Sequence, residues 1–345
     1  MADLFVTNMN PRFTGVSATA ANVIRQQVKS HDLRLVGQPL PGCPVPISIA
    51  KARQFSKPSA DRPVVIWHVR RNPEMRVAIW ARDVLRLPIR IVFTSAAQRR
   101  HSAYPRWLIN RMDAVIATTD KAAEFVPHVR AVVPHGVDTD LFAPAPNRAA
   151  AWGALGYGGT MGIATIGRIR PEKGTDLFVQ AMLKLLPDVP GAVALVLGQA
   201  AREHRGFLSK LQTQVATAGL SDRILFPGEI PAADLPTLMR TLSLVMQLPR
   251  YEGYGMVPLE GMASGVPFIG SDAGYYPAFA AQGRSGVVVS QEADSEAAHH
   301  AKTLLTDPDR FARMAQAARE IAENSFSAAT EAAGIEAVYQ TVLNP

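Results

Sequence analysis

The sequence predicts an α/β protein made of two doubly wound domains. Short apolar runs of strand length alternate with longer stretches of helical period along the whole chain, which is typical of parallel sheets covered by helices on both faces. The 345 residues, 48% of them apolar, are enough for two hydrophobic cores. The alternation stops once, over residues 143–162, and then restarts.

The first half contains six predicted strands, at residues 4–7, 33–37, 64–68, 89–94, 114–118 and 131–134. The clearest helix is predicted over residues 73–87. Pro73 suits its first turn. Val77, Trp80, Ala81 and Val84 recur at helical spacing, so we expect these four side chains to face the core.

The segment 143–162 is rich in alanine, proline and glycine and has no strand period. We therefore expect a domain boundary near 145–160, with a first domain at 1–150 and a second at 151–326. The second domain contains six predicted strands, at 163–167, 192–198, 224–227, 242–248, 267–271 and 287–290.

The net charge of +7 is unevenly distributed. Residues 1–150 hold 21 Lys and Arg against 10 Asp and Glu, and residues 151–345 hold 15 against 19. A basic first domain suits nucleic acid, anionic lipid or an acidic small molecule. Cys43 is the only cysteine, so no internal disulfide or thiolate metal cluster is expected. The chain start has no signal-peptide pattern, and we expect a cytoplasmic protein.

The most informative window is residues 248–265, LPRYEGYGMVPLEGMASG, which runs from a strand end through a glycine loop into a helix. Gly253 and Gly255 allow backbone amides to approach an anion closely. Glu252 and Glu260 supply carboxylates that accept hydrogen bonds from sugar hydroxyls. In isolation, such a pair is better explained by Glu252 as a helix cap and Glu260 as a solvated acid.

A second window, residues 167–176 (GRIRPEKGTD), also joins a strand to a helix. Arg168 and Lys173 stand at places from which both can face the same crevice. A guanidinium fork and an ammonium group are suitable partners for a diphosphate.

Together the two windows resemble the retaining glycosyltransferases of family 4. Glu252 and Glu260 match the E-x7-E signature, and the resemblance implies that Glu252 contacts the donor sugar, that Glu260 binds the ribose, and that Arg168 and Lys173 clamp the diphosphate. The backbone at the start of the helix is implied to contact the phosphates and the sugar: Gly253, Tyr254, Gly255, Met256 and Val257. The segment FPGEI resembles the turn beside the base, which adds Ile230. Gly15 stands near the place of a phosphate-binding glycine loop.

The resemblance covers most of the chain and implies the GT-B fold, with two Rossmann-like domains facing across a cleft. It also implies that a last helix, within 327–345, packs back on the first domain. The resemblance further implies a nucleotide-diphosphate sugar as co-substrate, and neither a cofactor nor a metal is expected. The sequence departs from the family at Gly274-Tyr-Tyr-Pro-Ala, which lacks the usual acid, and at Gly198-Gln-Ala.

The acceptor site is expected among basic residues that follow two strands of the first domain, namely His68, Arg70, Arg71, Arg99, Arg100 and His101. The segments IWHVRRNPEM and FTSAAQRRHS resemble lipopolysaccharide-core mannosyltransferases. This implies GDP-mannose as donor and a Kdo sugar of the lipid A inner core as acceptor, at the inner face of the cytoplasmic membrane. Trp80, Tyr104 and Trp107 suit either that membrane surface or core packing.

Three alternatives stay open. One is the same family with a UDP- or ADP-sugar, or with another glycolipid acceptor. Another is a nucleic-acid-binding protein that uses the basic half, although no recognised binding motif is present. A dinucleotide-dependent oxidoreductase is disfavoured, because no Gly-x-Gly-x-x-Gly follows the first strand.

Overall fold

The computed structural model describes residues 3–58 and 63–344, and the chain divides into two compact units. The first unit runs to Gly136 and also includes the residues from Phe326 onward. The second unit is Val137–Ser325. The division therefore falls before the segment 145–160 in which the sequence led us to expect it.

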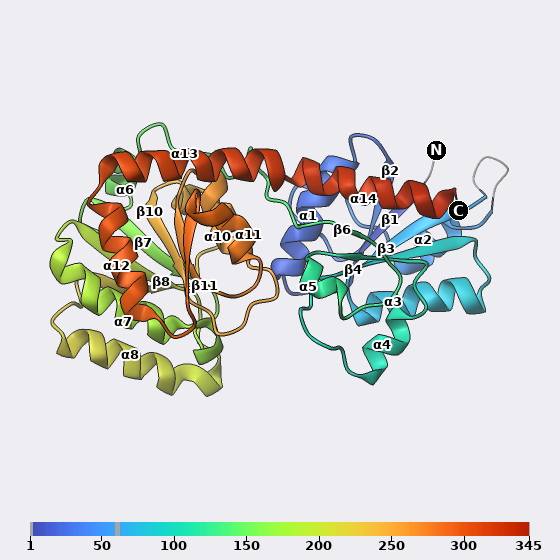
Figure 1. Cartoon of the computed structure of the whole chain (residues 1–345). Coiled ribbons are helices and arrows are strands. Elements are labelled where there is room, and N and C mark those ends of the chain that lie inside the picture. Colours follow the sequence, from blue (N-terminus) through green and yellow to red (C-terminus); the bar gives the residue numbers. More distant parts are fainter. Residues whose placement is uncertain (1–2, 59–62, 345) are drawn as a thin grey trace. The chain divides into compact units, whose positions relative to one another are not determined.

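The first unit contains a six-stranded parallel sheet in the order β2-β1-β3-β4-β5-β6 (Figure 1). Its elements are β1 (Asp3–Asn8), α1 (Gly15–Gln27), β2 (Asp32–Gly37), α2 (Ile49–Phe55), β3 (Val65–Val69), α3 (Asn72–Ile79), the π-helical turn η1 (Trp80–Val84), β4 (Ile89–Ser95), α4 (Ala103–Ile109), β5 (Ala114–Ala117), α5 (Asp120–Ala123), β6 (Val129–Val132) and α14 (Ala328–Leu343).

Strand β1 shows how this sheet is covered on both faces. Leu4 and Val6 pack into one core together with α1 and α14. Phe5 points the other way, into a core with α2, α3 and α4, because successive side chains of a strand alternate between faces. The last helix, α14, begins after Ser327, whose side chain accepts a hydrogen bond from the Thr330 backbone N–H.

The second unit contains another six-stranded parallel sheet, in the order β12-β11-β10-β7-β8-β9. Its elements are α6 (Arg148–Ala154), β7 (Met161–Ile166), η2 (Pro171–Lys173), α7 (Thr175–Leu185), η3 (Leu186–Asp188), β8 (Ala192–Leu197), η4 (Arg202–His204), α8 (Arg205–Thr217), β9 (Ile224–Gly228), α9 (Leu235–Met239), β10 (Leu242–Gln247), α10 (Met256–Ala263), β11 (Phe268–Ser271), α11 (Tyr276–Ala280), η5 (Ala281–Gly283), β12 (Gly286–Val289), α12 (Asp294–Leu305) and α13 (Pro308–Ser325).

Helices α7, α8 and α12 share one core with the second sheet, through residues such as Leu244 and Met246 of β10. Helix α10 lies on the opposite face, where Gly261 lets it approach Val245 closely. Both sheets therefore have helices on their two faces, and the α/β fold class predicted from the sequence is confirmed.

Two expectations about individual segments are wrong. The stretch expected to be a linker contains α6, whose first turn is capped by the Asn147 side chain and whose Trp152 is 1% exposed. The predicted helix over 73–87 changes to a π-helical turn at Trp80. Met75, Ala78 and Ile79 form the buried face of α3, so Trp80 and Val84 do not face the core and are 42% and 61% exposed, while Ala81 is buried.

Within the described ranges, no helix is both long enough and apolar enough to cross a membrane. Nor do three or more His, Cys, Asp or Glu side chains of these ranges gather into a group that would hold a metal ion.

Candidate functional site

The candidate site lies where the order of the second sheet reverses. Strands β7 and β10 are neighbours, but the chain continues from β7 toward β8 and from β10 toward β11. In such sheets the loops that leave the two strands diverge and open a crevice at the carboxyl ends. The loops here are 167–174 and 248–255, which are the two windows singled out in the sequence.

The two loops touch backbone to backbone at Gly174. This residue has φ +65°, and a Cβ built on it would lie 1.7 Å from the carbonyl oxygen of Leu248. No side chain fits there, so glycine is required both for the conformation and for the close approach. The contact brings the residue before it, Lys173, to the loop that carries Glu252.

Lys173 and Glu252 form an ion pair. The Lys173 Nζ lies 2.6 Å from Glu252 Oε2, with the two side chains 23% and 20% exposed. The other carboxylate oxygen, Oε1, accepts a hydrogen bond from the Gly253 backbone N–H at 3.0 Å. Two residues assigned separately from the sequence, one to the diphosphate and one to the sugar, are thus joined in the described structure.

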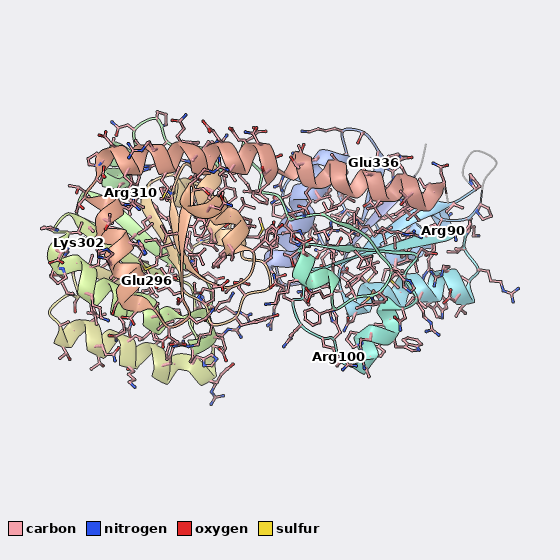
Figure 2. The ribbon with its side chains drawn as sticks, viewed as in Figure 1. Arg90, Arg100, Glu296, Lys302, Arg310 and Glu336 are labelled. Atoms are coloured by element: carbon pink, nitrogen blue, oxygen red, sulfur yellow. The ribbon has the colours of Figure 1, made fainter. Side chains whose placement is uncertain are left out.

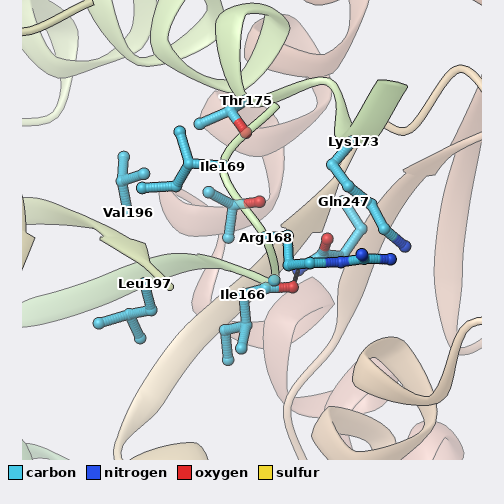
Figure 3. A pocket seen from close by; sticks show the side chains of 10 residues that line it. Ile166, Arg168, Ile169, Lys173, Thr175, Val196, Leu197 and Gln247 are labelled. Carbon is cyan, nitrogen blue, oxygen red and sulfur yellow. Dashed lines mark hydrogen bonds between the residues drawn. The ribbon is translucent and has the colours of Figure 1, made fainter. Parts of the chain in front are cut away.

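Arg168 and Lys173 line one small pocket at the end of β7, together with Gln247 (Figure 3). The side chains of Arg168 and Lys173 point toward the same side of the view. Gln247 is buried and donates a hydrogen bond to the carbonyl oxygen of Ile166. Arg168 is exposed, so its guanidinium is accessible to an anion.

Helix α10 begins directly after the glycine loop. Gly255 has φ +98°, and a Cβ there would lie 2.2 Å from a ring carbon of Tyr276. The first turn contains no acidic side chain, so the positive end of the helix and the free N–H groups of Met256 and Val257 are available to an anion. Tyr254 contributes only backbone here, because its ring is buried and stacked on Tyr275.

Glu260 is the fifth residue of α10 and keeps part of its surface exposed. Burial of its carboxyl group nevertheless raises its pKa from 4.5 to about 7, because the charged form loses hydration. Among the described residues, no side chain or backbone group forms a hydrogen bond with this carboxyl group. A ligand hydroxyl would supply the missing partner.

Ile230 follows β9 and is half-buried. It does not line the pocket at Arg168, since β8 separates β9 from β7 in the sheet. Gly274, by contrast, was given no role from the sequence, and a Cβ on it would lie 3.0 Å from Cγ of Glu252. The loop that departs from the family pattern therefore packs against the first glutamate.

The first sheet also reverses its order, between β1 and β3, and brings Gly15 near Arg71. Gly15 is exposed, with open space where a Cβ would stand. The Arg71 guanidinium donates to Thr14 and Ser17, at 3.1 and 2.9 Å. Arg71 therefore fixes the loop before Gly15.

Glu74 completes this arrangement. It is fully buried and accepts hydrogen bonds from the backbone N–H groups of Met9, Arg70 and Arg71. Its carboxylate is also paired with the Arg71 guanidinium at 3.2 Å. We expected Arg71 to be open to the acceptor. This expectation is wrong, because its guanidinium is bound to the neighbouring side chains of Thr14, Ser17 and Glu74.

His68 and Arg70 lie in the interior of the first unit. His68 is 0% exposed and stands between Tyr339 Oη, 2.5 Å from Nδ1, and Thr94 Oγ1, 2.7 Å from Nε2. Burial lowers the pKa of His68 well below its usual value. Arg70 is 7% exposed. The expectation that these two side chains line an open acceptor site is therefore wrong.

The remaining basic candidates follow β4. Arg99 and Arg100 are exposed, and Figure 2 labels Arg100 at the surface beside α4. His101 is half-buried, with Nε2 3.5 Å from Ser95 Oγ. Tyr104 and Trp107 of α4 are 49% and 48% exposed, which excludes the core-packing alternative for both.

The chain is similar to known glycosyltransferases in sequence and in fold. A family model described as glycosyl transferases group 1 matches residues 158–321. The lipopolysaccharide core biosynthesis mannosyltransferase LpcC of Rhizobium leguminosarum is 40% identical over 99% of this chain and 97% of its own length. The corresponding LpsB of Rhizobium meliloti is 36% identical, over 99% of this chain and 98% of its own.

Among solved structures, the Anabaena protein HepE, in complex with UDP and glucose, superposes with a TM-score of 0.81 at 17% identity, over 99% of this chain and 100% of its own. The fold is GT-B, as the sequence led us to expect. With a full-length relative at 40% identity and a matching family model over the second unit, the chain belongs to the group 1 glycosyltransferases.

Proposed function

We propose that this glycosyltransferase transfers mannose from GDP-mannose, with retention of configuration, to a Kdo sugar of the lipid A inner core. One observation carries the donor half of the proposal. A cation, a carboxylate and the start of a helix meet where the second sheet reverses its order, at Lys173, Glu252 and α10. The names of the two rhizobial relatives support mannose and the lipopolysaccharide core.

In the proposed complex, the diphosphate lies between Arg168, Lys173 and the N–H groups at the start of α10. Lys173 then exchanges its partner, Glu252, for a phosphate oxygen, and Glu252 is released to accept hydrogen bonds from the sugar hydroxyls. The exchange costs little, because both side chains are partly exposed and partly exposed ion pairs contribute little net energy. Glu260 accepts hydrogen bonds from the ribose.

The transfer breaks the bond between the anomeric carbon and the diphosphate oxygen. The acceptor hydroxyl forms the new bond on the same face of the sugar, and its proton passes to the departing phosphate oxygen. Arg168, Lys173 and the helix amides stabilise the charge that develops on the diphosphate, which is the effect expected to contribute most to the rate. The proposal uses no metal.

The acceptor half relies on the first unit. Kdo carries a carboxylate and lipid A carries phosphates, and the exposed Arg99 and Arg100 offer positive charge to either group. Tyr104 and Trp107 stack at 6.2 Å, and the Arg111 guanidinium lies 4.0 Å from the Trp107 ring centre. Exposed aromatic and basic side chains of this kind suit a peripheral position on an anionic membrane surface.

A second candidate donor is a UDP-sugar, favoured by the fold similarity to HepE, which was solved with UDP and glucose. The test is to incubate the purified protein with labelled GDP-mannose, UDP-glucose or ADP-glucose and Kdo-lipid A. We expect label in the lipid with GDP-mannose alone. Labelling from UDP-glucose alone would select the second candidate, and labelling from none of the three would refute both.

A further inference from the structure

Arg250 lies two residues before Glu252, and its guanidinium binds three residues of the second unit at once. Its Nε donates to Glu292 Oε1 at 2.5 Å. One terminal nitrogen donates to the Pro171 carbonyl oxygen at 2.5 Å and to Asp176 Oδ1 at 2.9 Å. The other donates to Asp176 Oδ2 at 2.9 Å and to Glu292 Oε2 at 2.8 Å.

These five hydrogen bonds use all five N–H donors of the guanidinium, and both carboxylates are bound in the two-pronged geometry that arginine favours. The two carboxylates raise the pKa of Arg250 above its usual value. A lysine has three donors on one nitrogen, so it cannot span Asp176, Glu292 and the carbonyl group together. The arrangement is specific to arginine.

Two of the residues that Arg250 binds flank Lys173 in the sequence. Pro171 precedes Lys173 by two residues, and Asp176 follows it by three. The backbone N–H of Arg250 also donates to the Glu172 carbonyl oxygen at 3.0 Å. Together with the close contact of Gly174 at Leu248, these bonds fasten the Lys173 loop to the Glu252 loop.

The backbone of Glu292 has an unfavourable conformation. It has φ +61°, in the left-handed region, where a non-glycine residue costs on the order of 1–3 kcal/mol when the surroundings enforce it. Glu292 lies between β12 and α12 and is 56% exposed. Its pairing with Arg250 brings a third loop into the assembly beside the site.

We propose that Arg250 is a positioning residue, which fixes the separation between Lys173 and Glu252 and keeps Lys173 in place when that lysine exchanges its carboxylate partner for a phosphate oxygen. The proposal rests on the function proposed above. Without Arg250, the loop that carries Lys173 shifts toward the ligand when Lys173 binds the phosphate. The Lys173 ammonium group is then no longer held at the place where negative charge develops on the departing diphosphate. A misplacement of about 1 Å at such a site lowers turnover by about 100-fold.

The kinetic test compares Arg250→Lys with the control Arg313→Lys, an exposed arginine on α13. We expect kcat/KM for GDP-mannose to fall by about 10- to 100-fold in the first and to stay unchanged in the second. In a Lys173→Ala background, Arg250→Lys should have less than about a twofold further effect. An equal loss in both backgrounds, or no loss in either, would overturn the proposal.

Glu292→Gln serves as a milder variant. It changes an exposed side chain and leaves the hydrogen bonds of Arg250 to Asp176 and Pro171 in place. We expect it to fold as the wild type and to lose kcat/KM by a few-fold. Wild-type kinetics in Glu292→Gln together with wild-type kinetics in Arg250→Lys would show that the cluster only stabilises the fold.

A second readout needs no substrate, so it remains decisive if no sugar nucleotide is turned over and the proposed function fails. The chain has eight lysines, and reductive methylation with ¹³C gives each a methyl NMR signal; that of Lys173 is identified by its loss in Lys173→Arg. We expect Arg250→Lys to move this signal toward its position in Glu252→Gln, and Arg313→Lys to leave it in place. A signal that moves in Glu252→Gln but not in Arg250→Lys would refute the positioning role.

Discussion

Replacing Lys173 with alanine should separate catalysis from stability. The ion pair with Glu252 is partly exposed, at 23% and 20%, so its loss should lower the free energy of unfolding by no more than about 1 kcal/mol. The released Glu252 is partly exposed and keeps its hydrogen bond from the Gly253 backbone N–H, so its charge is not left buried without a partner. The same substitution removes a cation from the place where the diphosphate would depart, a loss of about 2.7–4 kcal/mol in transition-state stabilisation.

The expected result is therefore a fall in kcat of about 100- to 1000-fold with nearly unchanged unfolding. Initial rates with labelled donor and urea unfolding measure the two quantities on one preparation. Lys302→Ala is the control, because Lys302 forms a more exposed ion pair with Asp188, at 2.9 Å, on the surface of the same unit. A loss of kcat below about tenfold in Lys173→Ala would refute the reasoning, as would a similar loss in the control.

Three further predictions concern single side chains. Burial raises the pKa of Glu260 to about 7, so between pH 4.5 and 7 the folded protein keeps a proton on Glu260 that the unfolded chain has lost. The free energy of unfolding should therefore fall by at most about 3 kcal/mol as the pH rises from 4.5 to 7. Urea unfolding of the wild type should show this decline, and Glu260→Gln should lack it. His68→Ala leaves the Tyr339 and Thr94 hydroxyls without their partner, so it should lower the free energy of unfolding by about 2–5 kcal/mol; a change below about 0.5 kcal/mol would contradict the buried network. Gly174→Ala places a methyl group against the Leu248 carbonyl oxygen, and calorimetry should show loss of GDP binding, whereas Gly206→Ala, with open space around it, should bind GDP as the wild type.

The donor-side geometry follows in large part from the sequence. Lys173 and Glu252 each stand just after a strand of a parallel sheet, and strands of such a sheet end at one edge. Their positions along the chain therefore predicted a shared crevice. The direct ion pair between them was not predicted, because it depends on the contact of Gly174 with Leu248, which links residues 74 positions apart.

Other features depend on partners that no local pattern reveals. His68 is buried because Tyr339, which lies 271 residues later, covers it. Trp80 is exposed because the side of its helix that faces the core is formed by Met75, Ala78 and Ile79, whereas the pattern in the sequence selected another face. The segment with Asn147 has the composition of a linker, yet the Asn147 cap and the buried Trp152 make it a helix of the second unit. Arg250 was part of the quoted window, but its five hydrogen bonds go to three residues outside it, Pro171, Asp176 and Glu292.

The central claim is that the diphosphate of a sugar nucleotide binds between Arg168, Lys173 and the start of α10 while Glu252 turns to the sugar. A crystal structure of the protein with GDP-mannose tests it most directly. We predict phosphate oxygens within hydrogen-bond distance of Lys173 Nζ, and the Lys173–Glu252 distance lengthened from 2.6 Å so that Glu252 contacts a sugar hydroxyl. A diphosphate bound elsewhere, with the ion pair intact, would contradict the account.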